Sequence, residues 1–351
     1  MTTRALRGGA LICAALMMTV HGVAVGSQSA GPLTVCHAGS VQLAFSQVET
    51  VFTSQHPEVA LKDVSGGSVA LAGRLAAGLE PCDVYAAADY QDIDLLLKPL
   101  GLADYTIVFA RGRMVLAYLA TDPKSHGVAA PGDFTPPTSI PNAADDWYRV
   151  LLAPGVRISS SHPFLDPGGY RAHMIFRLAQ AHYNVPNLSN LLLDHVTIDA
   201  AAARTDAANR PALGRDYNFQ FIYEHSAAAA AKSNPSYRYV ALPDRIDLST
   251  TSNDSYYAQA SVTIPGVGPA GRLSSVSIPA TRVAWGLTIL NKSLNPENAM
   301  AFVNLVLGPA GTAAFNAHGP SPITPALVSA SDYARLPKST QSLVTAGPVL
   351  P

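Results

Sequence analysis

Residues 33–45 read LTVCHAGSVQLAF, and this stretch decides how the first part of the chain folds. The apolar, β-branched run at 33–35 predicts a buried strand. Gly39 and Ser40 interrupt it, and apolar residues then recur at helical spacing, which predicts a helix over 40–54. A strand that turns through a small, hydroxyl-bearing corner into a helix is typical of an α/β unit.

The same pattern recurs further along the chain. Strands are predicted at 60–64 and 83–87, with a helix at 68–77 between them that begins at a second Gly-Ser pair, Gly67-Ser68. Such alternation predicts parallel pairing in a doubly wound sheet. Ligands of such sheets bind beyond the carboxyl ends of the strands, and both Gly-Ser corners are expected at that edge.

Periodicity predicts α and β elements over most of the remaining chain. Helices are expected at 91–97, 145–152, 170–182, 296–307 and 310–315, and strands at 107–109, 114–119, 157–160, 218–223 and 283–290. Loops are expected at 122–146, which is rich in Pro, at 200–215, and around short strands in 249–271. No internal repeat is evident.

Composition excludes several classes of protein. The 351 residues are 13% charged and 48% hydrophobic, with a formal net charge of −1. This balance excludes a polybasic nucleic-acid binder and a chain too polar to fold. The length favours two cores over one.

The N-terminus predicts a secretory signal peptide over residues 1–26. Arg4 and Arg7 precede an uncharged apolar stretch at 8–20, and a small-x-small site follows at 24–26. No later stretch reaches about 18 apolar residues, so the mature protein is expected in the periplasm or another extracytoplasmic space, without a membrane span.

Two cysteines, Cys36 and Cys82, remain after this segment. In an oxidising compartment they can form a disulfide, but a chain of this length does not need one. Both alternatives, a disulfide and two buried thiols, stay open. No clustered Cys/His spacing predicts a zinc site.

The two Gly-Ser corners suit an anion. The first amides of a helix lack internal acceptors, and the helix dipole makes that end mildly positive. A serine adds an O–H donor, and glycine lets a ligand approach the backbone. Each corner taken alone is better explained as a helix cap, since serine is a preferred N-cap residue, and it is the pair of corners that favours an anion site.

Two further places can contribute polar groups. Asp166-Pro167-Gly168 forms a tight turn before a helix, and Tyr223 ends the strand at 218–223. The alternatives are an ordinary Asx cap and a buried tyrosine with an ordinary partner. The chain has no G-x-S-x-G elbow, P-loop, G-x-G-x-x-G or H-E-x-x-H, so neither an enzyme nor a cofactor is predicted.

An ordered set of stretches carries a family resemblance. They are HAGSV (37–41), SGGSVALAGRLAAG (65–78), CDVYAAADYQDIDLLL (82–97), FARGRMVLAY (109–118), DWYRVLLAPGVRISSSHPFLDPGGYR (146–171), FQFIYEHSA (219–227), RYVALPDRIDL (238–248) and VAWGLTILNKSLNPENAMAFVNLVLGPAG (283–311). With these, the chain resembles the substrate-binding proteins of molybdate/tungstate ABC importers, in the branch common in archaea. The resemblance covers nearly the whole mature chain.

The resemblance implies a periplasmic binding protein of the second type, with two doubly wound α/β lobes joined by a two-strand hinge. Lobe 1 would comprise 31–117 and 284–351, and lobe 2 would comprise 118–283. Hinges would lie near Leu116–Ala120 and Thr281–Trp285.

The resemblance also implies the ligand contacts. Those expected are Gly39 and Ser40, then Ser68, then Asp166, Pro167 and Gly168, and lastly Tyr223. Some members of the branch bring two carboxylates to the metal of the oxyanion itself, and Asp166 matches the first of these direct ligands of molybdenum or tungsten.

The second carboxylate has no clear match in this chain. The corresponding position holds Arg204, followed by Thr205 and Asp206. Three alternatives stay open: Arg204 holds oxyanion oxygens with its fork, Asp206 or Glu224 supplies the missing oxygen, or Arg204 turns away and pairs with Asp206.

The function implied is a monomeric binding protein that takes a small oxyanion, molybdate or tungstate first, and delivers it to the membrane subunits of an ABC permease. Sulfate or phosphate are the alternative ligands, and a ligand-sensing module on the same fold is the alternative role. An enzyme would need a nucleophile or base that the sequence does not offer.

Overall fold

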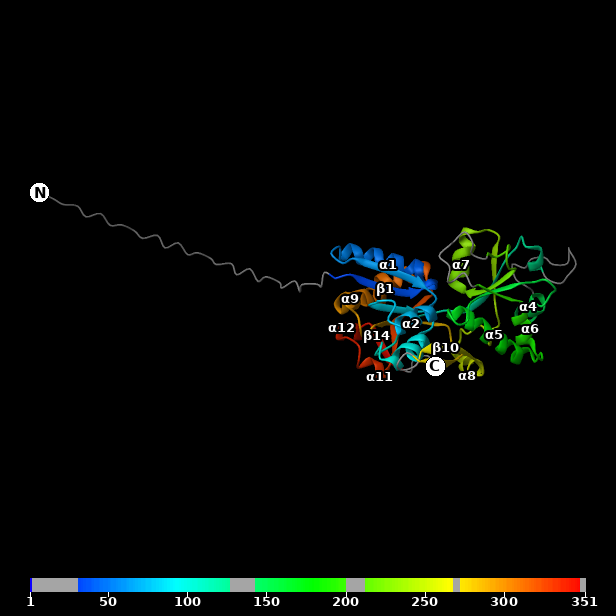
Figure 1. Cartoon of the computed structure of the whole chain (residues 1–351). Coiled ribbons are helices and arrows are strands. Elements are labelled where there is room, and N and C mark those ends of the chain that lie inside the picture. The colour runs from blue at the N-terminus through cyan, green and yellow to red at the C-terminus, as the bar shows by residue number, and fades with distance from the viewer. Residues whose placement is uncertain (2–30, 127–142, 200–211, 268–271, 348–351) are drawn as a thin grey trace.

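The computed structural model describes residue 1 and residues 31–126, 143–199, 212–267 and 272–347. The predicted signal peptide therefore lies outside the described residues, as does most of the Pro-rich segment. The rest forms two α/β bodies side by side, one built from both ends of the chain and one from its middle (Figure 1).

The first body is organised around a seven-stranded sheet with the strand order β14-β13-β4-β12-β3-β1-β2. Its strands are β1 (Leu33–Ala38), β2 (Leu61–Gly66), β3 (Val84–Ala87), β4 (Ile107–Arg111), β12 (Ala284–Ile289), β13 (Ser321–Ser329) and β14 (Val344–Gly347). Its helices are α1 (Gln42–Gln55), α2 (Ser68–Ala76), α3 (Tyr90–Asp92), α9 (Pro296–Leu307), α10 (Pro309–His318), α11 (Ala330–Tyr333) and α12 (Lys338–Gln341).

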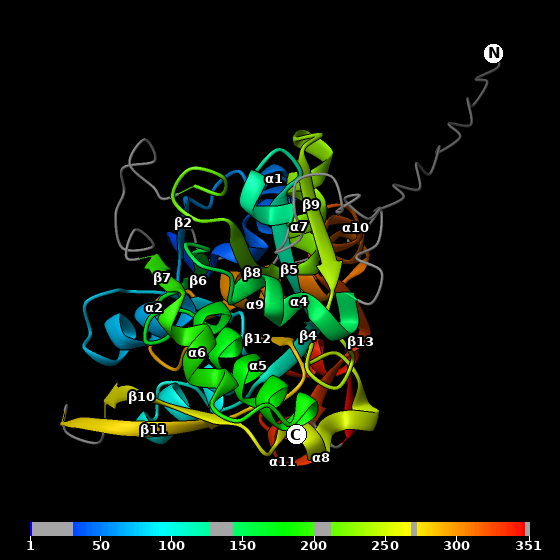
Figure 2. The same ribbon diagram turned by 90° about the vertical axis from the view of Figure 1, so that its right-hand side faces the viewer.

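The second body contains a five-stranded sheet with the order β7-β6-β8-β5-β9. Its strands are β5 (Met114–Leu119), β6 (Ile158–Ser161), β7 (Val196–Asp199), β8 (Phe219–Tyr223) and β9 (Tyr237–Ala241). Its helices are α4 (Ala143–Leu151), α5 (Pro167–Tyr183), α6 (Leu188–Asp194) and α7 (Glu224–Ser233). A separate hairpin of β10 (Ser261–Val267) and β11 (Leu273–Pro279) follows α8 (Asp254–Tyr257) and lies along one edge of the molecule (Figure 2).

The fold prediction of two α/β lobes is confirmed, and each sheet also contains antiparallel pairs that the strand–helix alternation did not predict. Strands β1, β2 and β3 pair in parallel, as the alternation predicts. Strand β12 pairs antiparallel with both β3 and β4. It arrives from the distant second body, so no helical crossover forces it to be parallel.

Several elements were not predicted, among them α6, β7, β9, β13 and β14. Helix α7 covers the Ala-rich run after Tyr223, where no helix was predicted. The hairpin has two seven-residue strands, longer than the short strands expected there.

The chain crosses between the sheets at two neighbouring segments. It leaves β4 for β5 through Gly112 and Arg113, and it returns to β12 after Val283. The amide of Gly112 donates to the carbonyl of Val283 at 3.0 Å, which ties the two crossings together. The lobe boundaries at 117/118 and 283/284 and the hinge positions stay predictions.

Cys36 on β1 and Cys82 before β3 form a disulfide, with their Cα atoms 5.9 Å apart. The sequence left open whether the two cysteines form a disulfide or stay as buried thiols, and in the structure they form the disulfide. It joins segments 46 residues apart in the chain, and Cys36 precedes Gly39 by three residues.

Helices α9 and α10 cover the first sheet together with α1 and bury Phe302 and Phe315 against Phe45. Among the described residues no single helix has the length and apolar character of a membrane span. The bent pair α9 and α10, with 59° between its halves, meets the test of length and composition jointly.

Candidate ligand-binding site

A cleft of about 690 Å³ lies between the two bodies, where several strands end. Strands β1, β2, β6 and β8 all deliver their carboxyl ends to it, as expected for an α/β ligand site. Its described lining comprises Gly39, Ser40, Gln42, Ser65, Gly66, Gly67, Ser161, Asp166, Gly168, Gln220, Phe221, Ile222, Tyr223 and Ser226.

The cleft gathers five of the nine residues expected at the ligand, which are Gly39, Ser40, Asp166, Gly168 and Tyr223. They come from segments far apart in sequence and from both bodies.

Four of the expected residues are not on the described lining. Ser68 is fully buried behind the wall, and its hydroxyl accepts a hydrogen bond from the amide of Ala88 at 2.9 Å. Pro167 is buried in the first turn of α5. Arg204 and Asp206 lie outside the described residues.

Glu224, one of the open alternatives for the second carboxylate, forms an ion pair with Arg113 at 3.1 Å. Both side chains are 41% exposed, and neither is among the residues that line the cleft.

Trp285 makes the hydroxyl oxygen of Ser40 a hydrogen-bond acceptor. The indole N–H of Trp285, which can only donate, gives a hydrogen bond to Ser40 Oγ at 3.0 Å. Since the oxygen is the acceptor there, the Ser40 proton is left to donate elsewhere. The carbonyl of Ser40 accepts from His225 Nε2 at 2.7 Å, which joins the corner to α7 of the second body.

Because a carbonyl oxygen can only accept, Nε2 of His225 carries a proton in this contact. Burial lowers the pKa of the imidazole, against the smaller opposing effect of the Ser40 carbonyl. The ring also packs edge-on against Trp285, with centroids 5.4 Å apart.

Arg171 likewise makes the hydroxyl oxygen of Tyr223 a hydrogen-bond acceptor. Arg171 Nη1 donates to it at 2.8 Å, and a guanidinium has no acceptor. The phenol oxygen therefore accepts, and its proton is free for a ligand. Burial raises the pKa of Tyr223 well above its ordinary value, so the group stays a neutral donor.

Asp166 caps the start of α5 and also lines the cleft. Its Oδ1 accepts from the amide of Gly168 at 2.8 Å, so the Asx cap that the sequence left open as an alternative is present. Burial raises the pKa of this carboxyl, although the Gly168 amide, Arg171 and the Ser161 hydroxyl act in the opposite direction. Asp166 is the one charged side chain on the described lining, which holds no Lys or Arg.

Arg171 fastens the two bodies to each other behind the cleft. It extends from α5 with 1% of its side chain exposed, donates to the carbonyl of Ala88 at 2.7 Å and pairs with Asp89 at 3.0 Å. The Tyr170 hydroxyl also donates to Asp89, at 2.8 Å. Burial, and then the charge of Asp89, raise the pKa of the neighbouring Asp92, which favours its neutral form.

Several polar lining residues were not singled out from the sequence, namely Gln42, Ser65, Ser161, Gln220 and Ser226. Ser65 and Ser161 had a usable signal, because each stands at the end of a strand that was predicted. Arg171 was also missed, although a lone cation within the apolar face of a helix suggests a buried ion pair.

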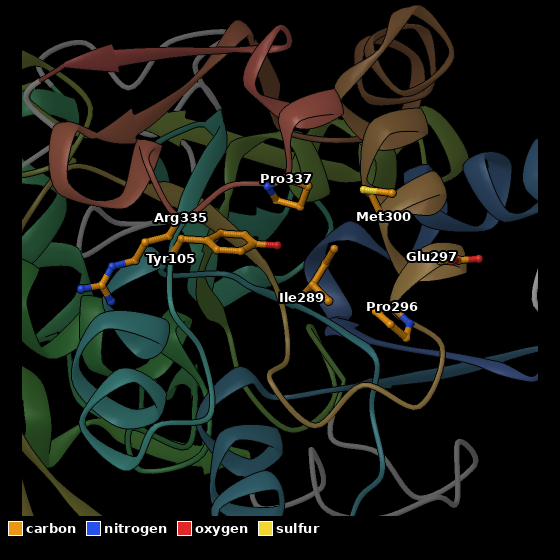
Figure 3. Close-up of a pocket in the computed structure, with 7 residues that line it drawn as sticks. All are labelled: Tyr105, Ile289, Pro296, Glu297, Met300, Arg335 and Pro337. Atoms are coloured by element: carbon orange, nitrogen blue, oxygen red, sulfur yellow. The ribbon is translucent and has the colours of Figure 1, made fainter.

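A second cavity, of about 270 Å³, lies within the first body (Figure 3). Its lining is mainly apolar, from Tyr105, Ile289 and Met300, and the charged ends of Glu297 and Arg335 point to opposite sides of the group. None of the residues expected at the ligand contributes to it, so the cleft between the bodies is the candidate site.

The fold and this cleft define a two-lobe solute-binding protein. Residues 33–320 match the family described as bacterial extracellular solute-binding protein, and the chain belongs to that family. This is a family of binding proteins and not of enzymes, and it indicates an extracytoplasmic location.

Named relatives span nearly the same length. An uncharacterized solute-binding protein of Petrotoga mobilis is 30% identical, over 84% of this chain and 85% of its own. A molybdate/tungstate-binding protein, WtpA, of Thermococcus kodakarensis is 26% identical, over 82% of this chain and 81% of its own. The sulfate-binding protein SubI of Mycobacterium tuberculosis shares the fold, with a TM-score of 0.53 and 15% identity over 84% of this chain and 87% of its own.

Replacing Arg171 by Met is expected to lower the free energy of unfolding by about 3–5 kcal/mol, because Asp89 is left charged and buried without its partner. The double variant Arg171→Met/Asp89→Asn removes both charges and is expected to recover a large part of that loss. Urea denaturation of the ligand-free protein measures both values. A double variant less stable than Arg171→Met alone would contradict this role of the pair.

Proposed function

We propose that the protein captures a tetrahedral oxyanion, molybdate or tungstate first, in the cleft between its lobes and delivers it to the membrane subunits of an ABC importer. The observation that carries the proposal is that the hydroxyl oxygens of two lining residues accept hydrogen bonds from the protein, which leaves their protons to donate. Ser40 and Tyr223 each accept from a group that can only donate, so both protons remain for a ligand rich in acceptors.

Neutral donors suit a small dianion taken out of water. The hydroxyls of Ser40 and Tyr223 replace part of the lost hydration, and the dipoles of α1, α2 and α5, whose N-terminal ends meet the cleft, favour negative charge. A cation on the lining is not required for such binding, and the described lining has none.

The carboxylate of Asp166 favours an oxyanion of a metal. An ionised carboxylate repels sulfate, whereas molybdenum(VI) and tungsten(VI) are hard centres that accept a further oxygen ligand. The Thermococcus relative, whose name states molybdate and tungstate, supports the same choice. Phosphate remains the second candidate, because a phosphate that keeps a proton can donate it to Asp166.

A ligand panel tests the proposal directly. Thermal unfolding is measured with molybdate, tungstate, sulfate and phosphate under otherwise equal conditions. Tungstate or molybdate at about 100 times its Kd is expected to stabilise the protein by roughly 2.7 kcal/mol, and sulfate by much less. A clear response to phosphate or sulfate, without one to tungstate or molybdate, would refute the choice of ligand.

Replacing Tyr223 by Phe is expected to weaken tungstate binding by about tenfold, since the donor of one hydrogen bond to the anion is lost. Tyr105→Phe is the matched control, because both tyrosines are 6% exposed and Tyr105 lies in the other cavity. Isothermal titration measures both affinities. An equal loss in the two variants would mean that Tyr223 acts through general stability.

Asp166→Asn separates metal coordination from hydrogen bonding. Asparagine still caps α5, so folding is retained, but it offers the metal no carboxylate. We expect at least about a tenfold loss of tungstate affinity. In the wild-type protein, affinity should rise with pH through the raised pKa of Asp166 and then level off, because the ionised form coordinates.

Titrations between pH 5 and 8 with micromolar tungstate measure this slope. If Asp166 donated a proton to the anion instead, affinity would fall as the pH rises. An unchanged affinity in Asp166→Asn would exclude direct coordination.

A further inference from the structure

Three metal-ligating side chains meet behind the wall of the cleft, outside the candidate ligand site. His37 lies on β1, Asp63 on the adjacent parallel strand β2, and Glu49 on α1, which packs over both strands. One donor atom from each lies within 4.8 Å of the other two.

The imidazole of His37 is fixed in one tautomer by its other nitrogen. Nδ1 lies 2.9 Å from the carbonyl of Ala38, which can only accept, so Nδ1 carries the proton. In the neutral ring Nε2 therefore presents a lone pair to the two carboxylates. A carbonyl or carboxylate partner on the second ring nitrogen is the usual arrangement of a metal-bound histidine.

One of the three donor atoms is buried without a partner among the described residues. Glu49 is 9% exposed, yet its Oε1 has no hydrogen-bond partner. His37 Nε2 is fully buried and is paired with Asp63 Oδ1, 2.8 Å away. Buried polar atoms are nearly always paired, so an unpaired oxygen aimed into the space that it shares with this pair indicates a missing partner.

We propose that His37, Glu49 and Asp63 bind one divalent transition-metal ion, zinc first. One imidazole nitrogen and two carboxylate oxygens are an ordinary zinc set, and two carboxylates balance the charge of the ion. Tetrahedral ligand atoms stand about 3.3 Å apart at zinc distances, so small rotations of the side chains complete the site.

The surroundings give the ion access and orientation. The Asp63 side chain is 30% exposed, which opens a path from solvent and leaves room for a water as the fourth ligand. Gln42 Nε2 donates to Asp63 Oδ2 at 2.9 Å and so orients the carboxylate with Oδ1 toward His37.

The site would connect to the cleft through Gln42, which also lines it. A bound ion would fasten β1, β2 and α1 together directly behind the Gly39 corner. The inference does not rest on the proposed oxyanion, since the three side chains lie outside the described lining of the cleft.

Zinc titration of the tag-free, EDTA-treated protein, without oxyanions or phosphate buffer, tests the site. We expect one zinc per chain by calorimetry, and an affinity at least about tenfold lower in both Glu49→Gln and Asp63→Asn. Cobalt(II) gives a second readout, because coordination by this set produces visible absorption that both variants should lose.

His56→Gln is the matched control. It removes a histidine that lies 3.7 Å from Glu58 at the end of the same helix, and it should leave zinc binding unchanged. If Glu49→Gln does not fold, the partly exposed Asp63→Asn carries the test. Absence of stoichiometric zinc binding, or equal affinity in the wild-type protein and Asp63→Asn, overturns the proposal.

Discussion

The buried guanidinium of Arg171 is the interaction on which the arrangement of the two lobes depends. It extends from α5 in the second lobe and makes its ion pair and a backbone hydrogen bond with Asp89 and Ala88 in the first. Removing such a charge from water is costly unless it is paired, so the lobes meet where Asp89 and the Ala88 carbonyl reach it. Its third partner, Tyr223, is thereby positioned at the cleft.

The hydrogen-bonding character of the cleft depends on Arg171 and on a second donor, Trp285. Arg171 and Trp285 can only donate, so the hydroxyls of Tyr223 and Ser40 must accept from them and point their protons elsewhere. A site built in this way presents donors to a ligand without placing a cation beside it. Under the proposed function, selectivity would come from geometry and from the carboxylate of Asp166, because a fully deprotonated anion without a metal centre, such as sulfate, gains nothing from that carboxylate.

Sequence alone predicted the parts of the site that local patterns define. The strand into Gly39-Ser40, the cap at Asp166 and the strand that ends at Tyr223 all follow from periodicity and turn chemistry, and the structure brings these residues to one cleft. Arg171 could not be placed in this way, because Tyr223 lies 52 residues away in the same body and Ala88 lies 83 residues away in the other, so that the contact with Ala88 forms only when the two bodies pack.

The same limit applies to the fold. The alternation of strands and helices predicted β1, β2 and β3 with their parallel pairing. It could not predict that β12 returns from the other lobe and enters the sheet antiparallel, because no local pattern records that crossing. The donor set of His37, Glu49 and Asp63 was hidden for a similar reason, since neither carboxylate is near the histidine in sequence.

Ser40 makes one hydrogen bond within its own lobe and one to the other lobe, which under the proposed function would couple ligand capture to lobe closure. Its hydroxyl accepts from Trp285 in its own lobe, while its carbonyl accepts from His225 in the other lobe. The hydrogen bond to His225 exists only while the lobes are together, and it holds the backbone that carries the ligand-facing hydroxyl. A ligand can shift the balance between open and closed forms only through contacts that differ between them. Under the proposed function, a small anion that contacts Ser40 and Tyr223 at once would gain both donors only in the closed form, and its presence would be converted into a change of shape that a membrane partner can read.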